Sequence, residues 1–221
     1  MIFEPTGIYH IYNQGNNRQP IFFSRENYLF FTRKMHQQIL PYADVLAWCL
    51  MPNHFHLMVE VKDFVNDSGA ADSRGATADS RGADSRGATC SRTPTNNTPA
   101  STPDLNHSIG IMLASYTRAI QKQENISGSL FRQKTKAICL NEIKNMQSNW
   151  YNAFGVTFMQ VDIPALHYPQ VCFNYIHANP VKAGLVKRAE EWEFSSYADL
   201  VGLRTGTLIN RERVAALGLV I

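Results

Sequence analysis

The residues from 54 to 61 alternate between two sets along the chain. One set is apolar and comprises Phe55, Leu57, Val59 and Val61. The other set comprises His54, His56, Met58 and Glu60. A period of two predicts a β-strand with one face in a hydrophobic core. Because residues two apart point to the same face of a strand, the side chains of His54 and His56 are predicted to lie side by side.

Three further elements are predicted before this strand. Aromatic and β-branched residues at 8–12 favour a strand. Residues 25–39 are predicted to form an amphipathic helix with Ser24 as its N-cap. The apolar positions at helical spacing are Tyr28, Phe31, Met35 and Ile39. An apolar run at 45–50 predicts a buried strand, and the tight connection at 51–53 joins it to the histidine strand as a hairpin.

Residues 63–104 interrupt this pattern with a low-complexity segment. A short repeat rich in Ala, Asp, Ser, Arg and Gly occurs at 71–77, 78–82 and 83–89. Large apolar side chains are almost missing from it, so the segment cannot bury enough surface to offset its ordering entropy. We expect a disordered insertion in a loop. Its Arg and Asp residues nearly balance in charge and carry no predicted site.

Helical periodicity returns directly after this insertion. The apolar stripe of the second predicted helix is Leu105, Ile109, Met112, Leu113, Tyr116 and Ile120. We expect this helix to pack on the same sheet as the first, to be broken by Gly128, and to be followed by an extended segment at 130–140. A third helix is predicted at 169–179 and should end at Asn179, because the residue before a proline is disfavoured in helical geometry. Residues 141–165 match neither pattern.

Together these elements predict an α+β fold in one domain, built from residues 1–62 and 105–200, with 201–221 as a C-terminal tail. The 221 residues are 44% hydrophobic, which is enough for a core of ordinary size. The net charge of +3 is only a weak indication of a polyanionic partner. The four cysteines show no Cys-x-x-Cys spacing, and we expect neither a leader peptide nor a membrane span. A reducing, cytoplasmic location is the simplest expectation.

The paired histidines indicate a candidate metal site. Two parallel imidazoles can share one divalent cation, although strand histidines that bind nothing have the same spacing. A third oxygen or nitrogen ligand would be needed. Tyr175 and Asn179 stand four residues apart and project from one face of the third predicted helix, so Asn179 could supply that ligand beside the Tyr175 phenol. A phenol with a pKa of about 10 needs a nearby cation or base before it can act as a nucleophile.

Two motifs resemble those of a known protein family. Residues 51–56, Met-Pro-Asn-His-Phe-His, resemble the His-hydrophobic-His signature of the IS200-like single-tyrosine transposases. Residues 174–184, Asn-Tyr-Ile-His-Ala-Asn-Pro-Val-Lys-Ala-Gly, resemble the tyrosine-helix motif of the REP-associated branch of that family. Residues 9–18 and 192–197 are also similar to segments of this branch. The combination of the two motifs at this separation is more specific than either motif alone.

This resemblance implies a ferredoxin-like α/β sandwich, in which helices cover one face of an antiparallel sheet. It implies cleavage of single-stranded DNA beside a hairpin, with Tyr175 forming a 5′-phosphotyrosine, followed by rejoining of strands. It also implies that His54, His56 and Asn179 hold Mg²⁺ or Mn²⁺. The implied partner is single-stranded or hairpin DNA, with no membrane involved, and the protein is expected to be a monomer or a homodimer.

The chain departs from the family pattern at two places. The repeat at 63–104 lengthens the loop after the histidine strand, and residues 141–166 form a longer segment than the family places before its tyrosine helix. An alternative function is therefore binding of single-stranded or hairpin nucleic acid without catalysis, as an inactive relic. A metal-dependent hydrolase is a further alternative, but such sites draw more His and Asp ligands from other strands.

A cationic stretch is the predicted DNA-binding region. Its members are Arg118, Lys122, Arg132, Lys134 and Lys136, to which Lys182 is added from the tyrosine motif. These residues could hold a single strand by charge, although a solvated helix face is the usual role of such a run. Tyr116 is the competing nucleophile, and its place on an apolar stripe favours packing instead. His177 is expected to be structural or to contact DNA, and Glu60 is not expected to be a ligand.

Overall fold

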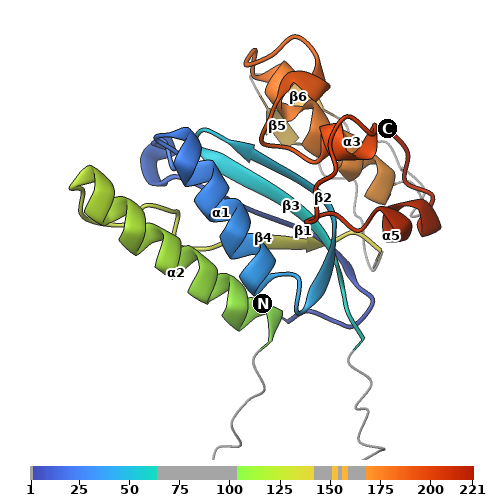
Figure 1. The fold of residues 1–221 in the computed structure, drawn as a ribbon, viewed down its shortest axis with the longest axis horizontal. Helices are drawn as coiled ribbons and strands as arrows, with labels where there is room; N and C mark the ends of the chain where they lie inside the picture. Colours follow the sequence, from blue (N-terminus) through green and yellow to red (C-terminus); the bar gives the residue numbers. More distant parts are fainter. Residues whose placement is uncertain (1, 64–103, 142–150, 154–155, 159–167) are drawn as a thin grey trace, which may run out of the picture. The chain divides into compact units, whose positions relative to one another are not determined.

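The computed structural model describes residues 2–63, 104–141, 151–153, 156–158 and 168–221. Its main sheet has the order β2-β3-β1-β4, and every neighbouring pair is antiparallel (Figure 1). The strands are β1 (Ile8–Gln14), β2 (Ala43–Met51), β3 (His54–Val61) and β4 (Lys136–Cys139). With helix α1 (Arg25–Gln38) after β1 and helix α2 (Leu105–Glu124) after β3, the chain follows the β-α-β-β-α-β order of ferredoxin-like folds. The predicted fold class is confirmed.

Helices α1 and α2 lie together against one face of this sheet, as predicted (Figure 1). The first hydrophobic cluster joins Phe31 of α1 and Tyr116 of α2 to the apolar side of β3, including Phe55 and Leu57. Ser24 is the N-cap of α1, and its N–H donates to Asn27 Oδ1 at 3.1 Å. Local periodicity was sufficient to place these helices, because each presents one apolar stripe to a single surface.

Helix α2 ends four residues before Gly128, the predicted break. Its C-cap is Asn125, which has φ 51° and ψ 41° in the left-handed region. Asparagine is among the few non-glycine residues that adopt this conformation readily, so it can terminate a helix. The strand observed in the segment that was expected to be extended, 130–140, is shorter than that segment, since only residues 136–139 pair as β4.

The opposite face of the sheet is covered as well, which corrects the expectation of helices on one face only. The second hydrophobic cluster packs Phe173 and Ile176 of α3 (Tyr168–Lys182) against Leu46 and Met58 of the sheet. The physical reason is visible in β2, whose residues are buried on both sides. A strand covered on both faces is apolar continuously instead of alternately.

Helix α3 continues through Pro180 to Lys182, so the prediction that Asn179 ends it was wrong. Proline lacks the N–H that would bond the carbonyl of residue 176. The side-chain amide of Asn179 donates to the carbonyl of Tyr175 at 2.8 Å and more weakly to that of Ile176 at 3.5 Å. The weaker of these two bonds reaches the Ile176 carbonyl that Pro180 leaves open, and the turn after the helix contains Gly184, which has φ +69°.

The C-terminal residues expected to form a tail pack within the same unit as the sheet. Ile209 forms an isolated bridge with Val45 of β2, and Val214 and Leu219 belong to the second hydrophobic cluster. The described helices that follow α3 are η3 (Ala189–Glu191), α4 (Tyr197–Leu200) and α5 (Arg211–Ala216), of which only α5 lies in the expected tail. A short helix, η1 (Asn16–Arg18), follows β1.

A separate two-stranded sheet pairs β5 (Tyr151–Ala153) with β6 (Val156–Phe158), within the segment that the sequence pattern left unassigned. Apart from its end residues, the predicted insertion at 63–104 lies outside the described residues. In the described ranges, none of the helices combines the length and the hydropathy of a membrane-spanning segment.

Candidate active site

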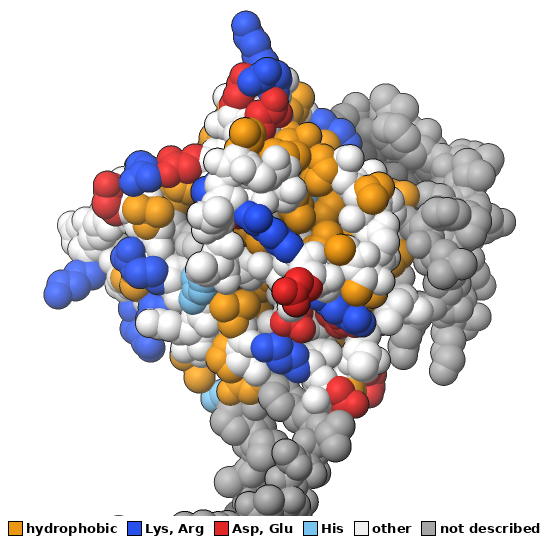
Figure 2. Space-filling view, turned by 45° about the vertical axis from the view of Figure 1, so that its right-hand side comes forward, with side chains coloured by type: hydrophobic (Ala, Val, Ile, Leu, Met, Phe, Trp, Pro, Cys, Tyr) orange, Lys and Arg blue, Asp and Glu red, His pale blue; other side chains and the backbone are white. Residues whose placement is uncertain are grey.

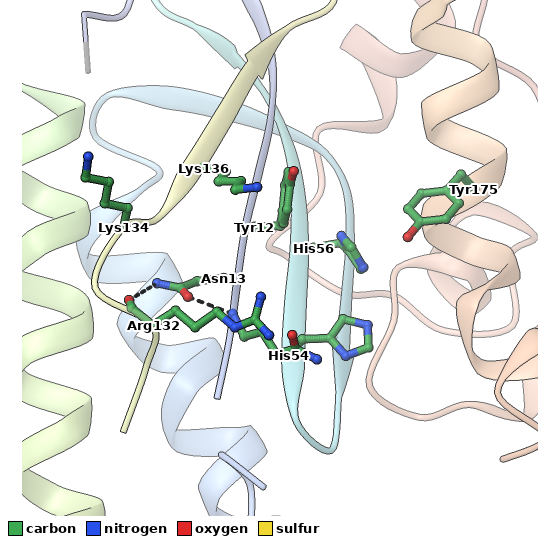
Figure 3. Close-up of a pocket in the computed structure, with 9 residues that line it drawn as sticks. Tyr12, Asn13, His54, His56, Arg132, Lys134, Lys136 and Tyr175 are labelled. Carbon is green, nitrogen blue, oxygen red and sulfur yellow. Dashed lines mark hydrogen bonds between the residues drawn. The ribbon is translucent and has the colours of Figure 1, made fainter. Parts of the chain in front are cut away.

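A pocket of about 240 Å³ lies where β1 and β3 run side by side. Their register pairs Tyr12 with His56 and Gln14 with His54, so these four side chains share one face of the sheet. The pocket is lined by Tyr12, Asn13, Gln14, His54, His56, Arg132, Lys134, Lys136 and Tyr175 (Figure 3). Four separate parts of the chain thus meet here: strand β1, strand β3, the segment leading into β4, and helix α3.

His54 and His56 point to the same side, as the alternation predicted, with ring centroids 4.9 Å apart. His54 Nδ1 is 2.6 Å from Asn53 Oδ1, which can only accept a hydrogen bond, so Nδ1 carries the proton. His56 Nδ1 is 2.9 Å from His10 Nε2. In both rings Nδ1 is engaged by a neighbour, and Nε2 is the nitrogen left for a ligand.

Burial keeps the pocket histidines neutral. It lowers the pKa of His54, and it lowers the pKa of His56 well below the ordinary value, with smaller contributions from His10 and His54. A neutral imidazole presents a lone pair to a metal, whereas a protonated one does not. The local electrostatics therefore keep both rings in the form that a cation needs.

The buried Nε2 of His56 has no hydrogen-bond partner in the described structure. Unpartnered buried polar atoms are uncommon and are often explained by a missing ion or water. Among the described residues, no group of three or more His, Cys, Asp or Glu side chains is arranged to hold a metal. A cation here would therefore take two histidines and complete its shell with other oxygen ligands, for which amide, phenol and phosphate oxygens are suitable.

Tyr175 reaches the pocket from α3, and its hydroxyl points toward the histidines (Figure 3). Its ring centroid is 5.3 Å from that of His56 and 6.2 Å from that of His10. The side chain remains 41% exposed, so a macromolecular substrate can reach it. Burial raises the pKa of the Tyr175 phenol, and a hydrogen bond with Asn179 partly opposes this shift. The phenol is therefore neutral at pH 7 and needs activation before it can attack.

Asn179 lies one helical turn from Tyr175 but does not line the pocket. Its amide nitrogen donates to the backbone of Tyr175, which leaves the side-chain oxygen as the atom able to bind a cation. Its proximity to Tyr175 follows from their i, i+4 spacing, as expected. Its role as third ligand remains a prediction.

The predicted DNA-binding residues separate into two groups in the structure. Arg132, Lys134 and Lys136 are exposed and line the pocket, and Lys182 Nζ lies 5.5 Å from the centroid of the Tyr175 ring. Arg118 and Lys122 are on α2, which covers the opposite face of the sheet. Elsewhere, Figure 2 shows Lys and Arg side chains interspersed with acidic and hydrophobic ones over one face. The local concentration of positive charge at the pocket is thus more informative than the net charge.

Sequence reasoning missed four residues of the site, all near the end of β1. They are His10, Tyr12, Asn13 and Gln14. The first two stack with ring centroids 4.9 Å apart, and Lys136 Nζ lies 6.0 Å from the Tyr12 centroid. The alternation seen in the histidine strand could have found three of them, since residues 10, 12 and 14 also fall on one face. It gives no signal for Asn13, which alternation assigns to the other face.

Tyr116, the competing nucleophile, is fully buried in the first hydrophobic cluster. Its hydroxyl donates to the carbonyl of Ile21 at 2.6 Å. A hydroxyl that is buried and already hydrogen-bonded to the backbone cannot reach a phosphate, so the packing interpretation of Tyr116 is confirmed. Glu60 pairs with Arg213 through both carboxylate oxygens, away from the pocket, in agreement with its exclusion as a ligand.

The fold is similar to that of a solved structure described as a REP-associated tyrosine transposase bound to a REP hairpin. The match has a TM-score of 0.47 at 14% sequence identity and covers 91% of this chain and 83% of that chain. No family model matches the chain, and no curated protein matches it. Fold and site together define a ferredoxin-like α+β protein with two histidines and one tyrosine converging on a cationic pocket. At this low identity, functional conclusions depend on the residues of that pocket.

Proposed function

We propose that this protein is a metal-dependent, single-tyrosine transposase that cuts and rejoins single-stranded DNA at hairpins. The observation that carries the proposal is the meeting of His54, His56 and Tyr175 in one cationic pocket, with the buried Nε2 of His56 unpartnered. The resemblance of residues 51–56 and 174–184 to the two transposase motifs supports the same conclusion. These segments are far apart in the chain, and local structure alone does not bring them together.

In the proposed reaction, Tyr175 Oη attacks a backbone phosphorus of single-stranded DNA. The Oη–P bond forms as the P–O3′ bond breaks, the phenolic proton passes to water, and the departing 3′ oxygen takes up a proton. The product is a 5′-phosphotyrosine and a free 3′-OH, and attack by another 3′-OH reverses the step and joins strands. Because the covalent bond to tyrosine conserves the phosphodiester energy, no external energy source is required.

His54 and His56 would hold Mg²⁺ or Mn²⁺, with Asn179 as the proposed third ligand. When bound, such a cation polarises the phosphate and stabilises its developing charge. Arg132, Lys134 and Lys136 line the same pocket, and in this proposal they neutralise the phosphates of the strand that enters it.

The decisive experiment is a covalent-adduct assay with hairpin DNA that carries a single-stranded extension. The label belongs on the 3′ end, because that fragment stays attached to the protein as the 5′-phosphotyrosine. We expect a labelled band on a denaturing gel with Mn²⁺ and none with EDTA. Tyr175→Phe should abolish the band, and Tyr116→Phe is the matched control that should retain it. An adduct that persists in Tyr175→Phe, or that is lost only in Tyr116→Phe, would contradict the assignment.

The second candidate function is binding of single-stranded or hairpin nucleic acid without catalysis. The partly exposed Tyr12 ring, with Lys136 above it and Arg132 and Lys134 beside it, is the observation that favours this function. An aromatic ring within a cationic groove can stack a base while the charges follow the backbone. Hairpin binding that is equally tight in EDTA, together with no adduct on any extension, would support this alternative over catalysis.

A further inference from the structure

A buried histidine pair connects the pocket to the strand next to it. His10 lies on β1 and His56 on β3, with 8% and 5% of their surfaces exposed. The 2.9 Å contact between His10 Nε2 and His56 Nδ1 is a hydrogen bond, so one of these two nitrogens carries a proton and the other accepts it. The two rings are nearly parallel, with an interplanar angle of 27°.

The direction of this bond determines which nitrogen of His56 faces the pocket with a lone pair. If His10 donates, His56 carries its own proton on Nε2, and a buried N–H is left without an acceptor among the described residues. If His56 donates from Nδ1, its Nε2 presents a lone pair instead. Only this second arrangement allows a cation to fill the unpartnered position.

We infer that His10 is a positioning residue: its Nε2 accepts a hydrogen bond from His56 Nδ1–H and thereby directs the His56 Nε2 lone pair into the pocket. This inference rests on the proposed function, in which His56 holds the cation. Nothing in the reaction requires His10 itself to touch the metal or the DNA. It acts through the tautomer and the orientation of its neighbour.

The surroundings of His10 hold its ring in place for this role. Tyr12 stacks on it, and the edge of Tyr175 approaches it with ring centroids 6.2 Å apart. His54, the other candidate metal ligand, has an equivalent partner, since Asn53 Oδ1 accepts a hydrogen bond from His54 Nδ1 at 2.6 Å. Both candidate ligands thus have an acceptor behind Nδ1, which is the usual arrangement around metal-binding histidines.

The first measurement uses the metal-free protein and does not depend on activity. In ¹⁵N-histidine NMR spectra of the wild type, we expect His56 to be protonated at Nδ1 and unprotonated at Nε2. A wild-type His56 protonated at Nε2 would overturn the inference directly. This result is available even if variants of His10 fail to fold.

The second measurement compares Mn²⁺ binding, by titration calorimetry or EPR, in the wild type, His10→Phe and His10→Gln. Phenylalanine keeps an aromatic ring but cannot accept a hydrogen bond from His56 Nδ1–H, whereas the Gln side-chain oxygen can. Loss of the hydrogen-bond acceptor that holds the second ring nitrogen of a metal-binding histidine typically lowers metal affinity by about 10–100-fold. We expect a loss of that order in His10→Phe and substantial recovery in His10→Gln, with circular dichroism spectra unchanged in both.

The outcomes separate this inference from the proposed function. If the wild type binds Mn²⁺ and His10→Phe binds it equally tightly, the inference fails and the metal site stands. If the wild type binds no Mn²⁺, or if His56→Ala binds it as well as the wild type, the proposed metal site fails. In that case the NMR tautomer still decides whether His10 orients His56.

Discussion

At the scale of single residues, burial decides which tyrosine is available for chemistry. Tyr116 and Tyr175 are both on helices with cationic neighbours, but Tyr116 is enclosed in the first hydrophobic cluster and Tyr175 stands at the rim of a pocket. Burial raises the pKa of Tyr116 above its ordinary value and that of Tyr28 to about 12. The buried phenols of Tyr116 and Tyr28 therefore contribute to the free energy of unfolding in a way that depends on pH.

The Tyr116 hydroxyl should be measurable in the free energy of unfolding. Because unfolded tyrosines ionise near pH 10 and the buried ones do not, stability should fall as pH rises above 10, by about 1.4 kcal/mol per pH unit for each such tyrosine. Tyr116→Phe leaves the Ile21 carbonyl without its donor, which should cost roughly 1–3 kcal/mol at pH 7. The same substitution removes one ionisable group, so the alkaline decline should become shallower.

Urea unfolding of the wild type and Tyr116→Phe between pH 7 and 11 measures both effects. Tyr175→Phe is the matched control, since its side chain is 41% exposed and should change stability less at neutral pH. Parallel curves for wild type and Tyr116→Phe above pH 10 would show that the buried phenol does not cause the decline.

Cysteine accessibility is a second property that follows from burial. Cys49 and Cys172 are buried, whereas Cys139 is partly exposed. Burial raises the pKa of Cys172 to about 12, and that of Cys49 still further, so neither forms thiolate readily. We expect an alkylating reagent to modify Cys139 much faster than these two in the native protein, with all three equal in urea. Mass-spectrometric mapping over time tests this, and early labelling of Cys172 would contradict the packing of α3.

At the scale of elements, the tyrosine helix is anchored to the sheet by a small polar network. His177 Nε2 lies 2.8 Å from Ser196 Oγ, which in turn accepts the backbone N–H of Trp48 in β2 at 2.9 Å. Both side chains are buried, and His177 is therefore structural in this fold. Phe173 and Ile176 supply the apolar part of the same contact.

Removing this network should loosen α3 more than the rest of the fold. Ser196→Ala removes the hydroxyl that links His177 to the Trp48 backbone, and an unsatisfied buried polar group costs about 1–3 kcal/mol. We expect faster hydrogen exchange in the amides of α3 and a lower yield of the proposed adduct. Ser195→Ala is the control, because Ser195 is equally buried but its hydroxyl accepts from Tyr197 N–H instead. Equal exchange in both variants would show that the network does not hold the helix.

At the scale of the whole molecule, folding of a single chain brings the tyrosine close to the histidines of the pocket. Within that chain, the ring centroids of His56 and Tyr175 are 5.3 Å apart. In a homodimer, the tyrosine helix of one chain could instead serve the pocket of the other, so this arrangement has a consequence that can be tested. A single chain should carry all the groups that the proposed cleavage needs.

Mixing two inactive variants tests this arrangement. Tyr175→Phe keeps the histidines, and His56→Ala keeps the tyrosine, so a helix exchanged between chains would rebuild a complete site in the mixture. We expect no covalent adduct when the two are mixed at equal concentration, in the assay that detects one with the wild type. Recovery of a substantial fraction of wild-type yield would show that the tyrosine acts on the partner's pocket.

Most of the local structure was predictable, because periodicity records which face of an element is buried. The alternation at 54–61 placed both histidines on one side, and the stripes of α1 and α2 located the helices on the other. The motif around Tyr175 indicated the nucleophile that we propose. Local rules failed at two helix ends: α3 continues past Pro180 to Lys182, and α2 ends before Gly128 with Asn125 as its left-handed C-cap.

The sequence by itself therefore determined most elements of the sheet and its first two helices, and the common face of His54 and His56; the tyrosine and metal chemistry that it indicated remains a proposal. Only the tertiary structure decided that α3 and residues 209–219 cover the second face of the sheet, and that His10 stands behind His56. These contacts join residues distant in the chain, through the pairing of β1 with β3 and the docking of α3. Local spacing indicates that one face of an element is buried, but it does not indicate which other element covers that face. The pocket is formed by contacts between such distant elements, so only the tertiary structure reveals it.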